Sequence, residues 1–193
     1  MRLRMFAVGT AVAAVVLLTA AAPAGATASN TSRSASAFWV LNDAWNSHVS
    51  LQGSEPASGG NGSLFLFVTQ SKCDTNTDEM VFRSWVAQGP LRPNEFHVLP
   101  NLKAAGMNAT KPVSGSEQRS PNCASPGNPT SFTSLGTSNV TIQVGWQGVG
   151  PVYTVQPGVT GRAAVADGRI TGSQLDLGRL GPSQTAELRS TTV

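Results

Sequence analysis

Charged side chains are scarce in this sequence, and they do not cluster. Lys, Arg, Asp and Glu together make up 12% of the 193 residues, with thirteen bases against ten acids. Binding to nucleic acid or to an anionic membrane surface depends on a basic cluster, and no run of Lys or Arg occurs after the first few residues. We therefore expect neither nucleic acid nor a membrane surface to be a partner.

Residues suited to metal binding or nucleophilic chemistry are also few. The sequence has two cysteines and two histidines, His48 and His97, and their spacing matches no zinc site. No G-x-S-x-G motif is present, which removes the nucleophile elbow of the α/β-hydrolases. We expect no cofactor and no enzyme activity; a secreted hydrolase that uses His48 or His97 is the alternative.

Helical periodicity is missing as well, and alternation takes its place. In residues 139–147, NVTIQVGWQ, the apolar residues from Val140 to Trp146 occupy every second position, as in a strand with one buried face. Residues 63–70, SLFLFVTQ, are instead a continuous apolar run. Such a run predicts a central strand that is covered on both sides.

Further strand-like segments recur at short intervals between Gly, Pro, Asn and Ser clusters. Asp167-Gly168 stands between two of them and predicts a tight hairpin turn. About ten short antiparallel strands in this pattern indicate an all-β fold, a single β-sandwich, with a β-barrel as the alternative. The remaining expected strands are residues 37–41, 48–52, 80–87, 95–99, 151–156 and 185–191.

The first 28 residues have the order of a secretory signal peptide. Arg2 and Arg4 precede an apolar run, and small residues in an A-x-A pattern follow. Cleavage after Ala28, or after Ala26 as the nearest alternative, would leave one β-rich domain over residues 29–193. We expect a secreted, extracellular protein with no membrane anchor in its mature form.

The predicted export of the protein also bears on the state of its two cysteines. In an oxidising compartment an even count favours one bridge, between Cys73 and Cys123. The bridge would anchor residues 111–131, which are polar and rich in proline and which we predict to be a long loop. A protein-interaction or inhibitor module that uses this loop is a second alternative function.

Residues 72–80, KCDTNTDEM, place Asp74, Asn76 and Asp78 at the spacing that opens a helix-loop-helix calcium loop. The sixth position of that loop lacks Gly and the twelfth lacks Glu. We interpret the segment as a polar hairpin turn, with a surface calcium site as the weaker candidate.

The four tryptophans suggest a ligand. Trp39, Trp45 and Trp146 could form an exposed platform on which sugar rings stack. With no catalytic constellation in view, this favours a secreted, non-enzymatic binding module for an extracellular carbohydrate or protein ligand. The sequence leaves the oligomeric state open.

The segment VGWQGVGPV, residues 144–152, is followed by a strand pair and a Gly-rich ending. This C-terminal half resembles small secreted proteins of unknown function from high-GC Gram-positive bacteria. The resemblance implies export and a β-rich fold and carries no activity.

Overall fold

The computed structural model describes residues 31–192. The predicted signal peptide, residues 1–28, and its cleavage site after Ala28 or Ala26 lie outside these residues. Within the described range the chain contains strands and turns but no helix, so no helix there is long and apolar enough to cross a membrane.

Eleven strands, all paired antiparallel, make up the fold, which confirms the predicted all-β class. The strands lie close to the expected segments but are mostly longer. They are β1 (Thr31–Leu41), β2 (Ser47–Glu55), β3 (Gly62–Asp74), β4 (Glu79–Leu91), β5 (Phe96–Val98), β6 (Ala104–Pro121), β7 (Ser131–Gly148), β8 (Tyr153–Gln156), β9 (Val159–Gly172), β10 (Gly178–Leu180) and β11 (Thr185–Thr192).

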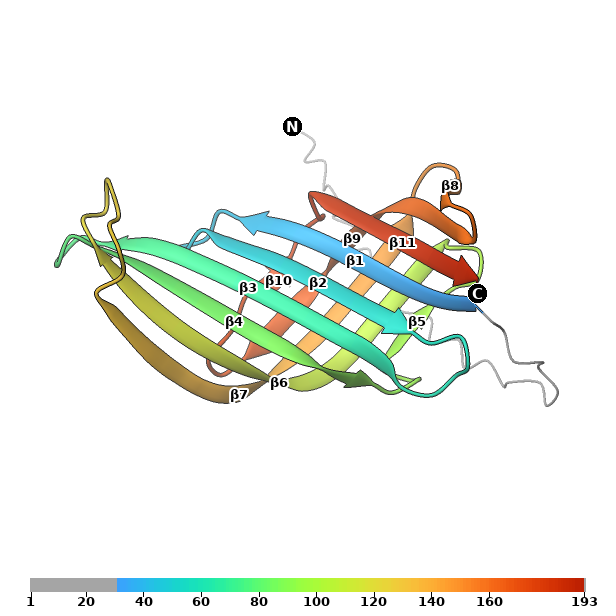
Figure 1. Cartoon of the computed structure of the whole chain (residues 1–193), viewed down its shortest axis with the longest axis horizontal. Helices are drawn as coiled ribbons and strands as arrows, with labels where there is room; N and C mark the ends of the chain where they lie inside the picture. The colour runs from blue at the N-terminus through green and yellow to red at the C-terminus, as the bar shows by residue number, and fades with distance from the viewer. Residues whose placement is uncertain (1–30, 193) are drawn as a thin grey trace, which may run out of the picture.

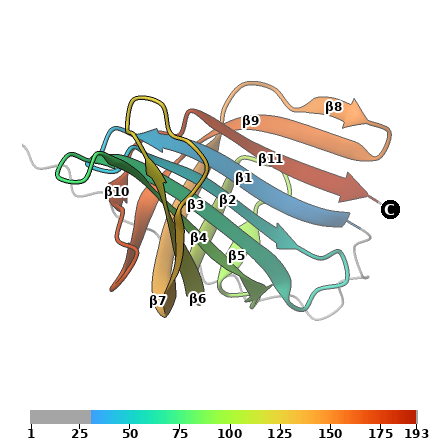
Figure 2. The ribbon, with the colours of Figure 1, turned by 60° about the vertical axis from the view of Figure 1, so that its left-hand side comes forward.

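The strands form one continuous sheet that closes on itself. The pairs run from β9 through β11, β1, β2, β3, β4 and β6 to β7, and β7 pairs with β9 again. Figures 1 and 2 show β1–β4 on one side of this ring and β6, β7 and β9 on the other. The two walls meet across the interior, where the Trp146 indole donates a hydrogen bond of 3.0 Å to the carbonyl of Ser36. The result is a sandwich-like β fold made from a single sheet.

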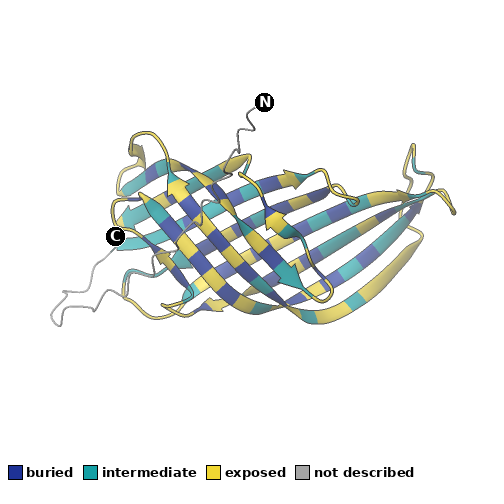
Figure 3. Ribbon diagram, turned by 180° about the vertical axis from the view of Figure 1, so that it is seen from behind, coloured by how far each residue is buried: buried dark blue, intermediate teal, exposed yellow. Residues whose placement is uncertain are grey.

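The core fills the inside of the ring. Along most of the strands alternate residues point inward, and buried and exposed positions therefore alternate along these ribbons in Figure 3. Because most inward positions carry Ala, Val, Leu, Ile or Trp, the interior is packed with apolar side chains. The completely buried residues include Val49, Leu66, Val68, Val113, Val140, Ile142, Ala166, Ile170, Leu180 and Leu188.

One predicted strand is placed differently from our expectation. Residues 63–70 do form the middle of β3, but of their apolar residues only Leu64, Leu66 and Val68 point into the core. Phe65 and Phe67 point outward and are 43% and 38% exposed. The prediction that both faces of this run are covered is wrong, because a closed ring has one interior and half of each strand must face away from it.

The predicted hairpin at Asp167-Gly168 is also wrong, since both residues lie inside β9. Gly168 pairs with Val144 of β7. A side chain at position 168 would collide with the backbone of Gln143. The glycine therefore serves the close approach of two strands rather than a turn.

The predicted long loop at residues 111–131 is mostly strand. Residues 111–121 continue β6, and β7 begins at Ser131. Pro112 does not interrupt β6, because pairing with β4 ends at Ser114 and no β4 partner needs its missing N–H. The nine residues that remain, 122–130, are the actual loop.

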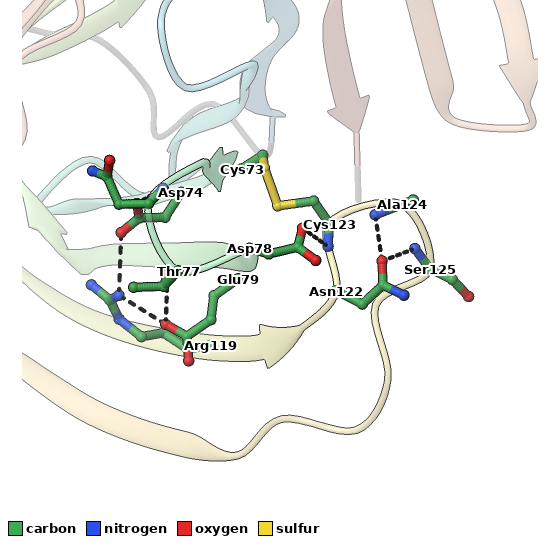
Figure 4. Close-up of a disulfide and its surroundings, with 11 residues drawn as sticks. Cys73, Asp74, Thr77, Asp78, Glu79, Arg119, Asn122, Cys123, Ala124 and Ser125 are labelled. Carbon is green, nitrogen blue, oxygen red and sulfur yellow. Dashed lines mark hydrogen bonds and ion pairs between the residues drawn. A yellow bond between two sulfur atoms is a disulfide. The ribbon is translucent and has the colours of Figure 1, made fainter.

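The hairpins β3–β4 and β6–β7 reach beyond the ends of β1 and β2, at the left of Figure 1. The disulfide between Cys73 and Cys123, which confirms the predicted bridge, joins the two hairpins there (Figure 4). Next to it, Arg119 contacts Glu79 at 3.2 Å and Asp74 at 3.7 Å.

Glu117 is the buried acid of this extension, at 8% exposure. It accepts hydrogen bonds from Nε of Arg83 at 2.8 Å and from Nε of Arg119 at 2.9 Å. Burial alone would raise the pKa of Glu117, but the two arginine hydrogen bonds outweigh it and lower the pKa below its ordinary value of 4.5. The ionised carboxylate therefore stabilises the folded state above pH 4.5, and this contribution is lost as the pH falls through the lowered pKa.

We expect Glu117→Gln to reduce the free energy of unfolding at pH 7 by about 1–3 kcal/mol, since hydrogen bonds to charged groups contribute this much. The difference from the unaltered protein should shrink as the pH falls from 4.5 through the lowered pKa of Glu117, because the unaltered protein then loses the same charge. Urea unfolding midpoints between pH 7 and pH 3 measure both effects. A difference that stays constant over this range would contradict the assignment.

Candidate functional site

A groove with a volume of about 620 Å³ runs across β5, β6, β7 and β9. We call it the glycine groove. Its polar lining residues come from four strands and from the turn before β5: Asn94, Glu95, His97, Asn108, Gln143 and Asp167. Of these residues only His97 is a candidate from the sequence alone.

Glycines form the floor of the groove. Gly106 of β6 lies directly opposite Gly145 of β7 in the strand register, and both are exposed. A Cβ atom built at either position meets nothing within 4 Å. Each neighbouring outward position along these strands carries a side chain. The absence of side chains at Gly106 and Gly145 therefore creates a trough that crosses the strands.

A titratable residue stands at each end of the floor. His97 pairs with Gly106 and Asp167 pairs with Gly145, so the four residues form one row across the sheet. In the adjacent row Asn108 lies opposite Gln143. An imidazole, a carboxylate and two amides therefore border a floor without side chains, and together they offer both donors and acceptors.

Glu95 lies at the edge of the groove and is held in its ionised form. Its carboxylate accepts a hydrogen bond from Lys111 Nζ at 2.7 Å and one from the backbone N–H of Arg92 at 2.8 Å. The hydrogen bond from Lys111 is the largest cause that lowers the pKa of Glu95. A fixed anionic acceptor thus lies beside the groove at neutral pH.

The two histidines of the predicted hydrolase alternative lie in different places. His97 is 62% exposed and its Nδ1 lies 3.2 Å from Glu55 Oε2. His48 lies on the outer face of β2, edge-to-face with Phe38 at a ring distance of 6.1 Å. The lining of the glycine groove contains no Ser, Thr or Cys, so no hydroxyl or thiol nucleophile accompanies His97 there.

The candidate calcium residues Asp74, Asn76 and Asp78 occupy the β3–β4 turn and its ends, and Figure 4 shows Asp74 and Asp78 there. Asp74 Oδ1 accepts the backbone N–H of Asn76 at 3.1 Å, and Asp78 Oδ1 accepts the backbone N–H of Cys123 at 3.3 Å. Asp78 also lies near the sulfur atoms of Cys73 and Cys123, but these are bonded to each other and are not thiolate ligands. The arrangement is that of a polar turn tied to the neighbouring hairpin.

The predicted tryptophan platform is wrong for two of its three members. Trp39 and Trp146 point into the core and are 1% and 2% exposed, and their indoles donate hydrogen bonds to backbone carbonyls. Both residues occupy inward-facing positions of β1 and β7. A large aromatic ring is stable in the core when its N–H has a hydrogen-bond acceptor. Trp45 is half-buried, with Lys72 Nζ and Arg83 Cζ each 4.1 Å from its ring centroid.

One signal in the sequence could have indicated the groove. A glycine inside a strand weakens it unless a bulge, a bend or a close approach to ligand or backbone needs the space. Gly106 and Gly145 both interrupt alternating segments, but only the register shows that they are neighbours. Comparisons with protein-family models, with curated proteins and with solved structures find no match for this chain.

Proposed function

We propose that the protein is a secreted, non-enzymatic binding module that holds an extracellular polysaccharide in the glycine groove. The observation that carries the proposal is the row His97, Gly106, Gly145, Asp167, a floor without side chains between two polar ends. The disulfide supports the extracellular part, because such bonds persist in oxidising compartments.

A sugar chain suits this groove for two chemical reasons. Pyranose rings have flat C–H faces, which need a close, smooth surface, and the outward Cα atoms of Gly106 and Gly145 provide one. The hydroxyl groups of the sugar rings both donate and accept hydrogen bonds. The amides of Asn108 and Gln143 at the side of the floor do the same. The few precisely placed polar groups would set specificity.

Filling the groove with an added side chain tests the proposal directly. Gly145→Val and Gly106→Val add a side chain into open space at strand positions, so each variant should fold as the unaltered protein does. We expect either change to weaken polysaccharide binding at least about tenfold, because a ring can no longer reach the floor. Affinity electrophoresis and titration calorimetry with xylan, β-1,3-glucan, hydroxyethyl cellulose, glycogen and chitohexaose measure this.

Gly181→Val is the matched control, since a Cβ at that exposed loop position also meets nothing and lies outside the groove. Equal binding by the Gly145→Val variant and the control would overturn the assignment of the site. Release of reducing ends from a bound polysaccharide would contradict the non-enzymatic part. Absence of binding to every polysaccharide would contradict the ligand class.

A further inference from the structure

The outer faces of β1–β4 form a surface without charged side chains, which we call the phenylalanine face. Strand register aligns its outward residues in rows across four strands. One row is Phe38, Ser50, Phe67 and Val86, and the next is Val40, His48, Thr69 and Ser84. A third row is Ser36, Gln52, Phe65 and Gln88.

Apolar side chains on this face are exposed to water. Val40, Phe65, Phe67, Phe82 and Val86 are each 36–43% exposed. Phe65 and Phe67 lie two positions apart on β3, and Phe67 lies opposite Val86 of β4, so these three side chains are neighbours. Val40 lies across β2 from them and Phe82 lies further along β4, with small or neutral polar side chains between. Contiguous apolar patches on a soluble protein mark surfaces that another molecule covers.

Charge favours a second copy of the same chain as that molecule. The three rows contain no Lys, Arg, Asp or Glu, so two such faces can meet without bringing like charges together. A partner with a charged surface would have to lose its hydration against this face without gaining a counter-charge. A neutral face of the same composition has no such cost.

The size of the face also suits a pair of copies. Four strands about 4.8 Å apart and three to four rows about 7 Å apart cover roughly 500 Å². Two copies would therefore bury about 1,000 Å² in total, the lower limit for a specific interface. Such an area is typical of a reversible dimer rather than of an obligate one.

A projection and a hollow lie side by side at the end of the face. Phe132 of β7 is 71% exposed. It pairs with Gln118, which pairs in turn with Phe82. Gln118 and Phe82 also line a depression of about 410 Å³ whose other lining residues include His48, Thr69, Ser71 and Ser84. Its one charged lining residue, Arg83, is paired with Glu117.

We propose that the phenylalanine face pairs with the same face of a second copy to form a two-fold symmetric dimer, which covers the depression beside Phe82 in each copy. A two-fold interface needs a surface that is complementary to itself, and a face without charged side chains meets this need. The glycine groove lies on the other wall of the ring and stays open in both copies. A polymer that spans both grooves would then bind with higher avidity.

Sedimentation velocity and light scattering on the purified protein from 1 to 500 µM test the proposal. We expect the mass to rise from monomer to dimer within this range, and Phe67→Ser and Val86→Ser each to raise the dissociation constant at least about tenfold. Val165→Ser is the matched control, because Val165 is 40% exposed on β9, outside the face. Its dimer should be unchanged.

Circular dichroism and melting curves show whether each variant folds, and both substitutions lie at exposed, outward positions of their strands. A monomer at every concentration would overturn the proposal and assign the face to a different partner. So would a dimer that both substitutions leave intact or that Val165→Ser weakens equally. The test needs no polysaccharide, so its outcome is independent of the proposed function.

Discussion

Replacing both Cys73 and Cys123 with Ala is expected to lower the free energy of unfolding by about 4 kcal/mol, because the unfolded chain regains the freedom of a long closed loop. The two cysteines are 50 positions apart in the sequence. The bridge also joins the ends of two hairpins that extend beyond the rest of the sheet, so its loss should loosen that end first. Urea unfolding followed by circular dichroism measures the change.

Asp78→Ala is the control for this experiment. It keeps the bridge and removes the hydrogen bond of 3.3 Å from the Cys123 backbone to the Asp78 carboxylate. We expect a loss of about 1 kcal/mol or less, because that contact is long and exposed. If the double alanine variant unfolds at the same urea concentration as the unaltered protein, the bridge does not contribute in the way we describe.

Trp85→Ala is the second large effect, with an expected loss of about 3–5 kcal/mol, as for other buried aromatic residues cut back to Ala. Trp85 is 2% exposed and packs over Gly115 so closely that a Cβ at position 115 would collide with its ring. Gly115 has no side chain that could fill the space left by the ring. The cavity therefore persists in the variant.

The indole of Trp85 also belongs to a buried polar chain. Its Nε1 donates to Gln70 Oε1 at 3.0 Å, Gln70 Nε2 donates to Ser47 Oγ at 3.0 Å, and Ser47 Oγ donates to Asp43 at 2.7 Å. Trp85→Phe removes the donor while keeping a ring, and Gln70→Leu removes its acceptor. Each should cost less than Trp85→Ala, and the reverse order in urea unfolding would contradict the cavity explanation.

The proposed dimer interface and the proposed polysaccharide groove are two distinct surfaces. The groove is shaped by glycines, which leave the backbone exposed. The phenylalanine face is defined by aromatic rings at outward positions, where polar residues are the usual choice. Both depend on outward positions of strands whose inward positions are ordinary core residues. A substitution on either surface can therefore change binding without changing the fold.

Local chemistry alone predicted part of this structure. The alternation of residues 139–147 reflects a strand with one buried face, and Val140, Ile142, Val144 and Trp146 indeed point inward. The even cysteine count predicted the bridge. The polar turn at Asp74, Asn76 and Asp78 followed from side chains that bond their own backbone, which requires no distant partner.

Other predictions failed where a distant partner decides the outcome. Asp167-Gly168 has the composition of a hairpin turn, but pairing with β7 holds it in a strand. Trp39 and Trp146 were predicted to form a sugar-binding platform, but both occupy inward-facing strand positions and their rings are buried. The apolar run of β3 gave no sign that half of it would face water.

The sequence by itself therefore determined the all-β class, most strand positions and the disulfide, because alternation, turn residues and cysteine number are local or countable properties. Only the tertiary structure decided the closure of the sheet, the pairing of Gly106 with Gly145, and the alignment of Phe38, Phe67 and Val86. The physical reason is strand register: a shift of one residue exchanges the two faces of a strand, and register is set by contacts between residues far apart in the chain.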